Sequence, residues 1–209
     1  MEVDLFPASD FDGWAGTYDQ DVLDETRFPF TGYQAALQAV LRLAEPQPGM
    51  RVLDIGTGTA NLAALFLARG CEVWGTDFSA EMLAAARRKL PQAHFLLADV
   101  RNGWPAGLPP VFERIVSAYT FHHFDLGQKV SLITGLAEHL ASDGRLVIVD
   151  IAFPHRAGMA RVRQTVGAAW EDEYYWLADE TIPALRQAGL EVAFTPVSAC
   201  AGVFGMEKR

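Results

Sequence analysis

Short apolar runs alternate with segments of helical periodicity along most of the chain. The first apolar run covers 51–55, and a helical pattern follows it at 61–68 after a glycine-rich turn. Such alternation is typical of βα units, which build a parallel sheet with helices on both faces. The same pattern predicts further strands at 71–76, 94–98, 114–118 and 145–150, and further helices at 33–44, 79–90, 128–140, 159–170 and 181–188.

The C-terminal segment departs from this alternation. Residues 191–196 and 202–207 are predicted to be strands, with only 197–201 between them. Strands joined by so short a connection pair antiparallel, because a parallel pair needs a long crossover. We therefore expect an α/β fold, a Rossmann-like three-layer αβα sandwich with a seven-stranded, mostly parallel sheet and an antiparallel C-terminal strand pair.

The glycine-rich turn after the first strand is the strongest candidate for a ligand site. Asp54 lies near the end of the strand, and Gly56 and Gly58 follow, where the absence of a Cβ permits positive φ and close approach of the backbone. The helix after the turn presents its N–H groups to the same place. Asp77 follows the second predicted strand, where a carboxylate can hold ribose hydroxyls, and Ser79 is available to cap the next helix. Together these features predict a nucleotide site.

Polar residues also follow the later strands. Asp99 comes after the third, the segment 117–123 after the fourth, and Asp150 after the fifth. Each aspartate alone could be a helix cap or a turn former. Their common placement at the carboxyl edge of the sheet, where open α/β proteins bind ligands, strengthens the prediction.

Composition and charge narrow the class of partner. Half of the 209 residues are hydrophobic, and no Pro/Gly/Ser-rich linker divides the chain, so we expect a single domain, 1–209. The net charge of −9 disfavours nucleic acid and favours a small-molecule partner. Because no segment resembles a signal peptide or a membrane span, we expect a cytoplasmic protein with no membrane partner. Cys71 and Cys200 lie in apolar contexts and are expected to be buried thiols.

Several motifs together resemble those of the class I S-adenosylmethionine-dependent methyltransferases, in the order of that family. The arm FDGWAGTYD resembles that of small bacterial, Bacillus-type putative methyltransferases of unknown acceptor. One departure is Ala60, which stands in place of the third glycine of the first turn and is small enough to serve there. The matching segments are VLDIGTGTANLA (52–63), VWGTDFSAEML (73–83), FLLADV (95–100), FERIVSAYTFHHF (112–124), LASDGRLVIVD (140–150) and the closing GLEVAF and GVFGME.

This resemblance implies S-adenosylmethionine as the methyl donor and S-adenosylhomocysteine as the product. It implies an N-terminal arm and helix lid at 1–48, a donor-binding core at 49–150, an acceptor-side insertion at 151–178, and a closing helix and strand pair at 179–209. It assigns Asp54 and Gly56 to the methionine amino group, Gly58 and Asp77 to the ribose, Phe78, Asp99 and Val100 to the adenine, and Ala118 and Tyr18 to the methionyl portion, with Thr57, Asn61 and Met82 completing the donor site.

The chemistry of the acceptor determines whether a base is needed. An oxygen or nitrogen acceptor that starts protonated needs one, whereas a thiolate or carboxylate does not. The candidates are His123, with its neighbour His122, then Asp150 and His155, and a purely structural role for the His-His pair remains an alternative. No Cys/His or His-x3-His ligand spacing is present, so we expect no metal site.

Two other functions fit the same turn. A nicotinamide-dependent oxidoreductase would also use Asp77, but Asn61 stands where its third fingerprint glycine belongs. A non-catalytic protein that binds S-adenosylmethionine or S-adenosylhomocysteine would keep the whole pocket.

The oligomeric state could be monomer or homodimer, and the aromatic, acidic cluster at 170–176 could line the acceptor pocket or form a dimer contact. Candidate pocket walls are Tyr18, Trp170, Tyr174 and Tyr175.

Overall fold

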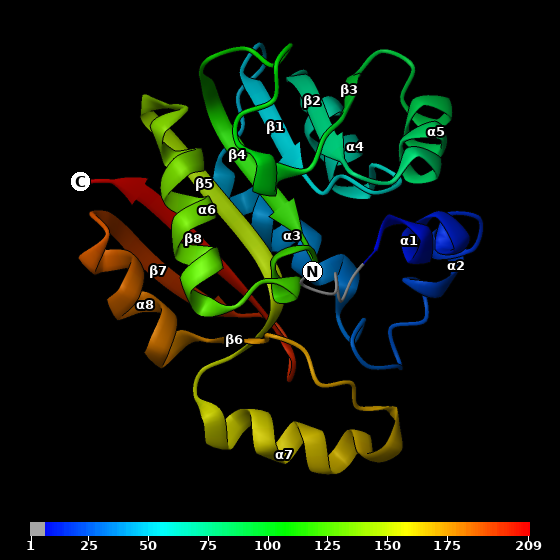
Figure 1. The fold of residues 1–209 in the computed structure, drawn as a ribbon, viewed down its shortest axis with the longest axis vertical. Coiled ribbons are helices and arrows are strands. Elements are labelled where there is room, and N and C mark those ends of the chain that lie inside the picture. The colour runs from blue at the N-terminus through cyan, green and yellow to red at the C-terminus, as the bar shows by residue number, and fades with distance from the viewer. Residues whose placement is uncertain (1–6) are drawn as a thin grey trace.

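The computed structural model describes residues 7–209, so the first six residues of the expected arm lie outside the described part. A single sheet forms its middle layer, with the strand order β3-β2-β1-β4-β5-β8-β7 and with β6 paired to β5 beside this path (Figure 1). The strands are β1 (Arg51–Ile55), β2 (Glu72–Asp77), β3 (His94–Leu97), β4 (Phe112–Ala118), β5 (Leu140–Phe153), β6 (Trp176–Leu177), β7 (Leu190–Pro196) and β8 (Ala201–Lys208).

The strand directions confirm the expected α/β fold. The neighbours from β3 to β5 pair in parallel, while β8 runs antiparallel to both β5 and β7. The short strand β6 was not predicted, because two residues carry no periodic pattern. Strand β5 is longer than the expected 145–150, and its pairing with β4 shifts register between Phe112 and Arg114.

Helices cover both faces of the sheet. In Figure 1, α3 and α4 lie behind the sheet and α6 lies in front of it. The helices α1 and α2 were not predicted, because the aromatic and acidic segment that contains them shows poor hydrophobic periodicity. The helices are α1 (Ala8–Trp14), α2 (Tyr18–Asp21), α3 (Tyr33–Ala44), α4 (Asn61–Leu67), α5 (Ala80–Lys89), α6 (Leu126–Glu138), α7 (Arg156–Val166) and α8 (Ala178–Gln187), with 3-10 turns η1 (Val100–Asn102), η2 (Phe121–His123) and η3 (Gly167–Ala169).

The central strands are buried on both faces. Along β1, Val52 packs into the apolar cluster that includes α3 and α4, whereas Leu53 and Ile55 pack into the cluster that includes α6 and α8. Burying one such side chain contributes about 1.5–3 kcal/mol, so this strand is a rigid part of the core. The turn that follows β1 is therefore held firmly in place.

The arm lies below the carboxyl ends of the first strands. Figure 1 shows α1 and α2 beneath α5, on the side to which the arrow of β1 points. Contacts between α1 and α5 connect the arm to the core. Within the described residues, no helix has the length and apolar character needed to cross a membrane. The fold thus brings the arm and the predicted ligand edge together.

Candidate functional site

The turn between β1 and α4 has the left-handed backbone that its sequence predicts. Gly56 and Gly58 have φ values of 64° and 53°. Ala60 has φ 69°, a region in which a side chain costs roughly 1–2 kcal/mol, so the replacement of the third glycine is tolerated with some strain. A Cβ on Gly56 would lie 2.2 Å from Thr120 Oγ1, so only glycine fits at this position.

Asp77 connects the end of β2 to this turn. Its carboxylate accepts hydrogen bonds from the backbone N–H of Gly58 at 2.8 Å and of Ser79 at 2.9 Å. Ser79 caps α5 with its own hydroxyl, which accepts from Met82 N at 3.1 Å. Burial raises the pKa of Asp77 above its ordinary value, and these backbone donors partly offset that effect. Each oxygen still has acceptor capacity for a ligand hydroxyl.

A cavity of about 520 Å³ lies at this edge of the sheet. It extends from the turn to the two histidines of η2 and is covered by the N-terminal arm and by the segment after α7. Eight of the predicted site residues line it: Tyr18, Gly56, Gly58, Asp77, Phe78, Met82, Ala118 and His123.

Five predicted donor residues are not part of the cavity wall. Asp54 is buried beneath the turn, where Oδ2 accepts from the Thr57 hydroxyl at 2.8 Å and Oδ1 has no hydrogen-bond partner among the described residues. Asn61 donates to Asp19 and accepts from a lysine of α5. Asp99 caps η1, which contains Val100, and pairs with Arg101 at 2.8 Å.

Two aspartates fasten the arm over the cavity. The carboxylate of Asp12 accepts from the Ser79 hydroxyl at 2.6 Å. Asp19 pairs with Lys89 Nζ at 2.7 Å and accepts from the Thr59 hydroxyl at 2.5 Å. Between these contacts, the ring of Phe11 lies edge-on to Phe78 and to His123, with ring centroids 5.1 and 5.4 Å apart. Phe11 was not singled out in the sequence, because its segment shows no period.

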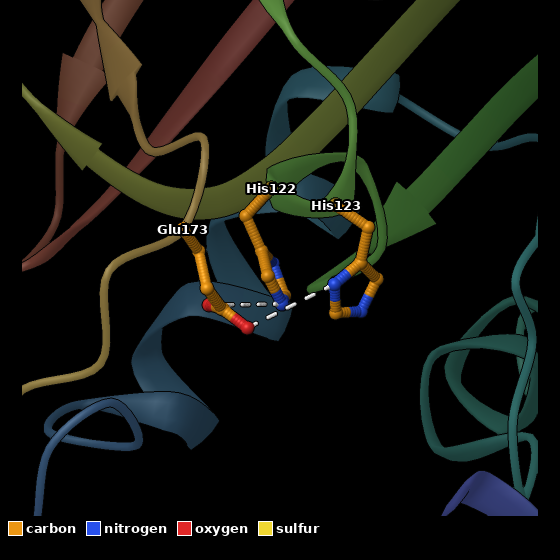
Figure 2. A group of neighbouring side chains, drawn as sticks. All are labelled: His122, His123 and Glu173. Carbon is orange, nitrogen blue, oxygen red and sulfur yellow. Dashed lines mark ion pairs between the residues drawn. The ribbon is translucent and has the colours of Figure 1, made fainter. Parts of the chain in front are cut away.

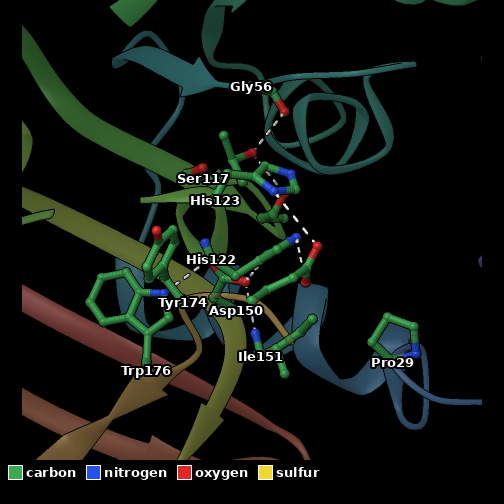
Figure 3. A network of polar contacts seen from close by, with 12 residues as sticks. Pro29, Gly56, Ser117, His122, His123, Asp150, Ile151, Tyr174 and Trp176 are labelled. Carbon is green, nitrogen blue, oxygen red and sulfur yellow. Dashed lines mark hydrogen bonds and ion pairs between the residues drawn. The ribbon is translucent and has the colours of Figure 1, made fainter. Parts of the chain in front are cut away.

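Asp150 orients His122 from behind the cavity wall. It is 0% exposed, and its Oδ1 lies 2.6 Å from His122 Nδ1, while Oδ2 accepts from the His122 backbone N–H and from Trp176 Nε1 at 2.9 and 3.0 Å (Figure 3). Burial alone would lower the pKa of His122, but the carboxylate of Asp150 outweighs it and raises this pKa above its ordinary value. Asp150 is therefore positioned to act through His122 rather than on a ligand directly.

Glu173 completes a cluster with the two histidines. Its carboxylate lies 3.8 Å from His122 Nε2 and 3.9 Å from His123 Nδ1 (Figure 2). Burial lowers the pKa of His123 to about 3 and raises the pKa of Glu173 above its ordinary value. The ligand-type atoms of the three residues all lie within 4.8 Å of one another, which is a spacing that could hold a metal ion.

The structure separates the other candidates. His155 is exposed at the start of α7, where its Nδ1 accepts from Gly158 N at 3.1 Å, and it does not line the cavity. In the cluster at 170–176, the cavity is lined by Glu171, Glu173 and Tyr175, but not by Trp170. Tyr174 is 44% exposed, and Trp176 is buried beside Asp150. Successive side chains of an extended segment point to opposite sides, so the residues of this cluster are divided between the cavity, the solvent and the core.

Comparison with known proteins agrees with this architecture. A family model described as a methyltransferase domain matches residues 52–144. An uncharacterized methyltransferase of Geobacillus thermodenitrificans is 32% identical over an alignment of 213 positions, which covers 95% of each chain.

Solved structures share the fold. A complex named DhpI-SAM-HEP has a TM-score of 0.75 at 19% identity and covers 99% of both chains. The magnesium protoporphyrin IX methyltransferase ChlM of Synechocystis PCC 6803, solved with bound S-adenosylhomocysteine, has a TM-score of 0.69 at 20% identity and covers 86% of this chain and 85% of its own. The motifs, the fold and the 32% identical relative agree, and the chain belongs to the class I S-adenosylmethionine-dependent methyltransferases.

Proposed function

We propose that the chain transfers a methyl group from S-adenosylmethionine to a small-molecule acceptor by in-line displacement, with donor and acceptor in the same cavity. The observation that carries this proposal is the continuity of that cavity, which runs from the glycine-rich turn to the histidine cluster within about 520 Å³. Pockets for small ligands span roughly 300–1,000 Å³. Family membership favours methyl transfer over the nicotinamide chemistry and the binding-only role that the sequence left open.

The donor end of the cavity consists of the turn and Asp77. Gly56 and Gly58 leave room for the methionyl chain and the ribose, Asp77 accepts from the ribose hydroxyls, and Phe78 with Met82 flanks the adenine. The bound donor supplies an electrophilic methyl group on a sulfonium. Tyr18 and Ala118 close over the methionyl portion and exclude water from it. Asp99 and Val100 remain candidates for the adenine edge, and Thr57 and Asn61 support the turn.

The acceptor end combines an aromatic wall with a polar cluster. Phe28 and Tyr175 line the cavity and meet edge-on, and Phe28 also stacks on Trp170, which lies outside the lining, with ring centroids 5.1 Å apart. The polar groups at this end include His122, His123, Glu171 and Glu173. We therefore expect a mostly apolar acceptor whose reacting atom lies beside the histidines, about 3 Å from the methyl carbon in the reactive complex. A proton lost by an oxygen or nitrogen acceptor would pass to this cluster.

A screen of acceptors tests this proposal. Purified protein is incubated with S-adenosylmethionine and a panel of small apolar alcohols, phenols, acids and amines, and S-adenosylhomocysteine is measured by mass spectrometry. We expect Phe28→Ala to raise KM for an active acceptor about tenfold while leaving affinity for S-adenosylhomocysteine unchanged, since the Phe28 ring packs against Trp170 and Tyr175. Turnover on a protein or an RNA, with none on the panel, would contradict a small-molecule acceptor.

The pH dependence of donor binding tests the role of Asp54. Burial raises the pKa of this carboxyl to about 7, with partial offset by the Thr57 hydroxyl. The ammonium group of the donor's methionyl portion favours the ionised form of Asp54. Donor binding at a pH below this pKa must therefore release the proton from Asp54. We expect affinity for S-adenosylhomocysteine to rise about tenfold from pH 6 to pH 8 and to level off above it.

The matched control is Asp54→Asn, which cannot ionise. Isothermal titration at each pH should show weaker binding by this variant at pH 8 and no rise in its affinity between pH 6 and pH 8. If the wild-type affinity is flat across this range, or if the variant keeps the full pH dependence, Asp54 is not the group that responds.

A further inference from the structure

Three side chains at the acceptor end present their ligand atoms to one point. His122 and His123 are consecutive in η2, and Glu173 faces them from a segment 50 positions further along the chain (Figure 2). Their closest separations are 3.8 and 3.9 Å, and all three ligand atoms lie within 4.8 Å of one another. Around a metal ion with bonds of about 2.0–2.2 Å, such atoms would stand about 3–3.5 Å apart. Binding of an ion would therefore draw all three side chains closer together than they stand here.

His122 has the kind of hydrogen-bond partner that metal-binding histidines usually have, a carboxylate at the ring nitrogen that does not bind the metal. Nδ1 of His122 contacts Asp150, whose carboxylate is fixed by Trp176 Nε1 and by the backbone N–H of Ile151 (Figure 3). A carboxylate at Nδ1 fixes the ring orientation and leaves Nε2 as the coordinating atom. Here Nε2 is the nitrogen that faces Glu173.

The backbone around the three residues is also tied together. Tyr174 N donates to the His122 carbonyl at 3.0 Å. The buried ammonium of Lys129 donates to the carbonyls of Phe124 and Tyr174, which follow the histidines and Glu173 directly. The two ligand-bearing segments are therefore held side by side before any ion binds, which reduces the cost of ordering them.

We propose that His122, His123 and Glu173 bind one divalent first-row transition metal ion, whose open coordination positions face the cavity and take an oxygen of the acceptor. Two imidazoles and one carboxylate favour ions such as Zn²⁺, Fe²⁺ or Co²⁺ over Mg²⁺ and Ca²⁺, which prefer oxygen ligands. The negative charges of Glu173 and Asp150 offset the double positive charge of the ion, whereas the nearby ammonium of Lys129 opposes it. The acceptor-binding role rests on the proposed function, whereas the metal site does not.

Sequence spacing could not reveal this site. The His-His pair offers no metal-binding period, and Glu173 is brought to it only by the return of the chain after α7. The expectation of no metal site rested on sequence spacing, and the proposal made here departs from that expectation.

The test is a titration of untagged, chelator-treated full-length protein with Co²⁺, followed by its visible absorption bands, and with Zn²⁺ by calorimetry. We expect one ion per chain and at least about tenfold weaker binding by Glu173→Gln, in which an amide replaces the carboxylate ligand. Asp150→Asn is expected to weaken binding about 10–100-fold through the orientation of His122. The matched control Glu171→Gln lies in the same cavity wall but outside the cluster, and it should keep the wild-type metal affinity.

Binding of S-adenosylhomocysteine, measured on the same samples, separates the possible failures. Glu173→Gln should keep its affinity for this ligand, which shows that the variant is folded and that its loss concerns the ion. Wild-type protein that binds no Co²⁺ or Zn²⁺ stoichiometrically, or equal metal affinity in Glu173→Gln and Glu171→Gln, overturns the metal site. Metal binding without S-adenosylhomocysteine binding would instead count against the proposed function and leave the metal site standing.

Discussion

Asp77→Ala is expected to weaken binding of S-adenosylhomocysteine about 100-fold or more. Two hydrogen bonds from ribose hydroxyls to a carboxylate contribute roughly 1.5–3 kcal/mol each, so their loss amounts to about 3 kcal/mol or more. The carboxylate is only 7% exposed, so water replaces it poorly. The same change removes the acceptor for Gly58 N, which anchors the turn to β2.

Calorimetry of wild-type protein, Asp77→Ala and Asp77→Asn measures this effect. Asparagine keeps one acceptor oxygen without the charge, so its affinity should lie between the other two. If the variants unfold at the same temperature as the wild-type protein, the loss of affinity is due to the lost contact with the ligand. Binding by Asp77→Ala within about threefold of the wild-type affinity would remove Asp77 from the donor site.

Gly56→Ala is expected to have the largest effect on stability, a loss of about 3 kcal/mol in the free energy of unfolding, together with loss of donor binding. The new Cβ would lie 2.2 Å from Thr120 Oγ1, 2.5 Å from its Cγ2 and 2.9 Å from its Cβ. Because the Thr120 Cβ itself is too close, a change of rotamer cannot relieve the overlap. The backbone after β4 must move, and it carries the histidine pair.

Gly49→Ala is the matched control for this prediction. Gly49 also has positive φ, at 84°, but a Cβ there meets no atom within 4 Å. Its replacement should cost only the strain of the left-handed region, roughly 1–2 kcal/mol, and should leave donor binding intact. Urea unfolding of both variants makes the comparison, and equal losses would show that the close approach of Thr120 is unimportant.

The donor end of the site could be predicted because its signals are local. Asp54, Gly56 and Gly58 are adjacent in the chain, and the positive φ of the two glycines follows from their residue type. The position of Asp77 follows from the βα alternation, since neighbouring parallel strands end at the same edge. Helix α3 begins and ends at the predicted residues 33 and 44, because two prolines follow a clear helical period.

The acceptor end could not be predicted in the same way. Glu173 and Phe11 come from segments without periodicity, far from the histidines in sequence, and only packing brings them together. Asp150 was expected as a direct catalytic group, but its place inside β5 leaves it fully buried behind His122. His155 was chosen for its residue type alone, and its position at the start of α7 turns it toward the helix backbone.

In the arm, residue type indicated a position at the cavity even though the short helices of the arm were not predicted. Tyr18 was expected to close over the ligand, and it lines the cavity from α2. The fastening contacts of Asp12 and Asp19 join the arm to α5 and to the turn, pairings that no short-range pattern encodes. The positions of residues could therefore be predicted where one strand and its turn define them, but not where separate segments of the chain meet.

Under the proposed function, donor and acceptor share one cavity, with the transferred group directed at the histidine cluster. A crystal structure of the chain with S-adenosylhomocysteine tests this most directly. We predict ribose hydroxyls on Asp77, adenine beside Phe78, and the sulfur atom facing His122 and His123. A ligand bound outside this cavity, or one whose sulfur faces away from the histidines, would contradict the account.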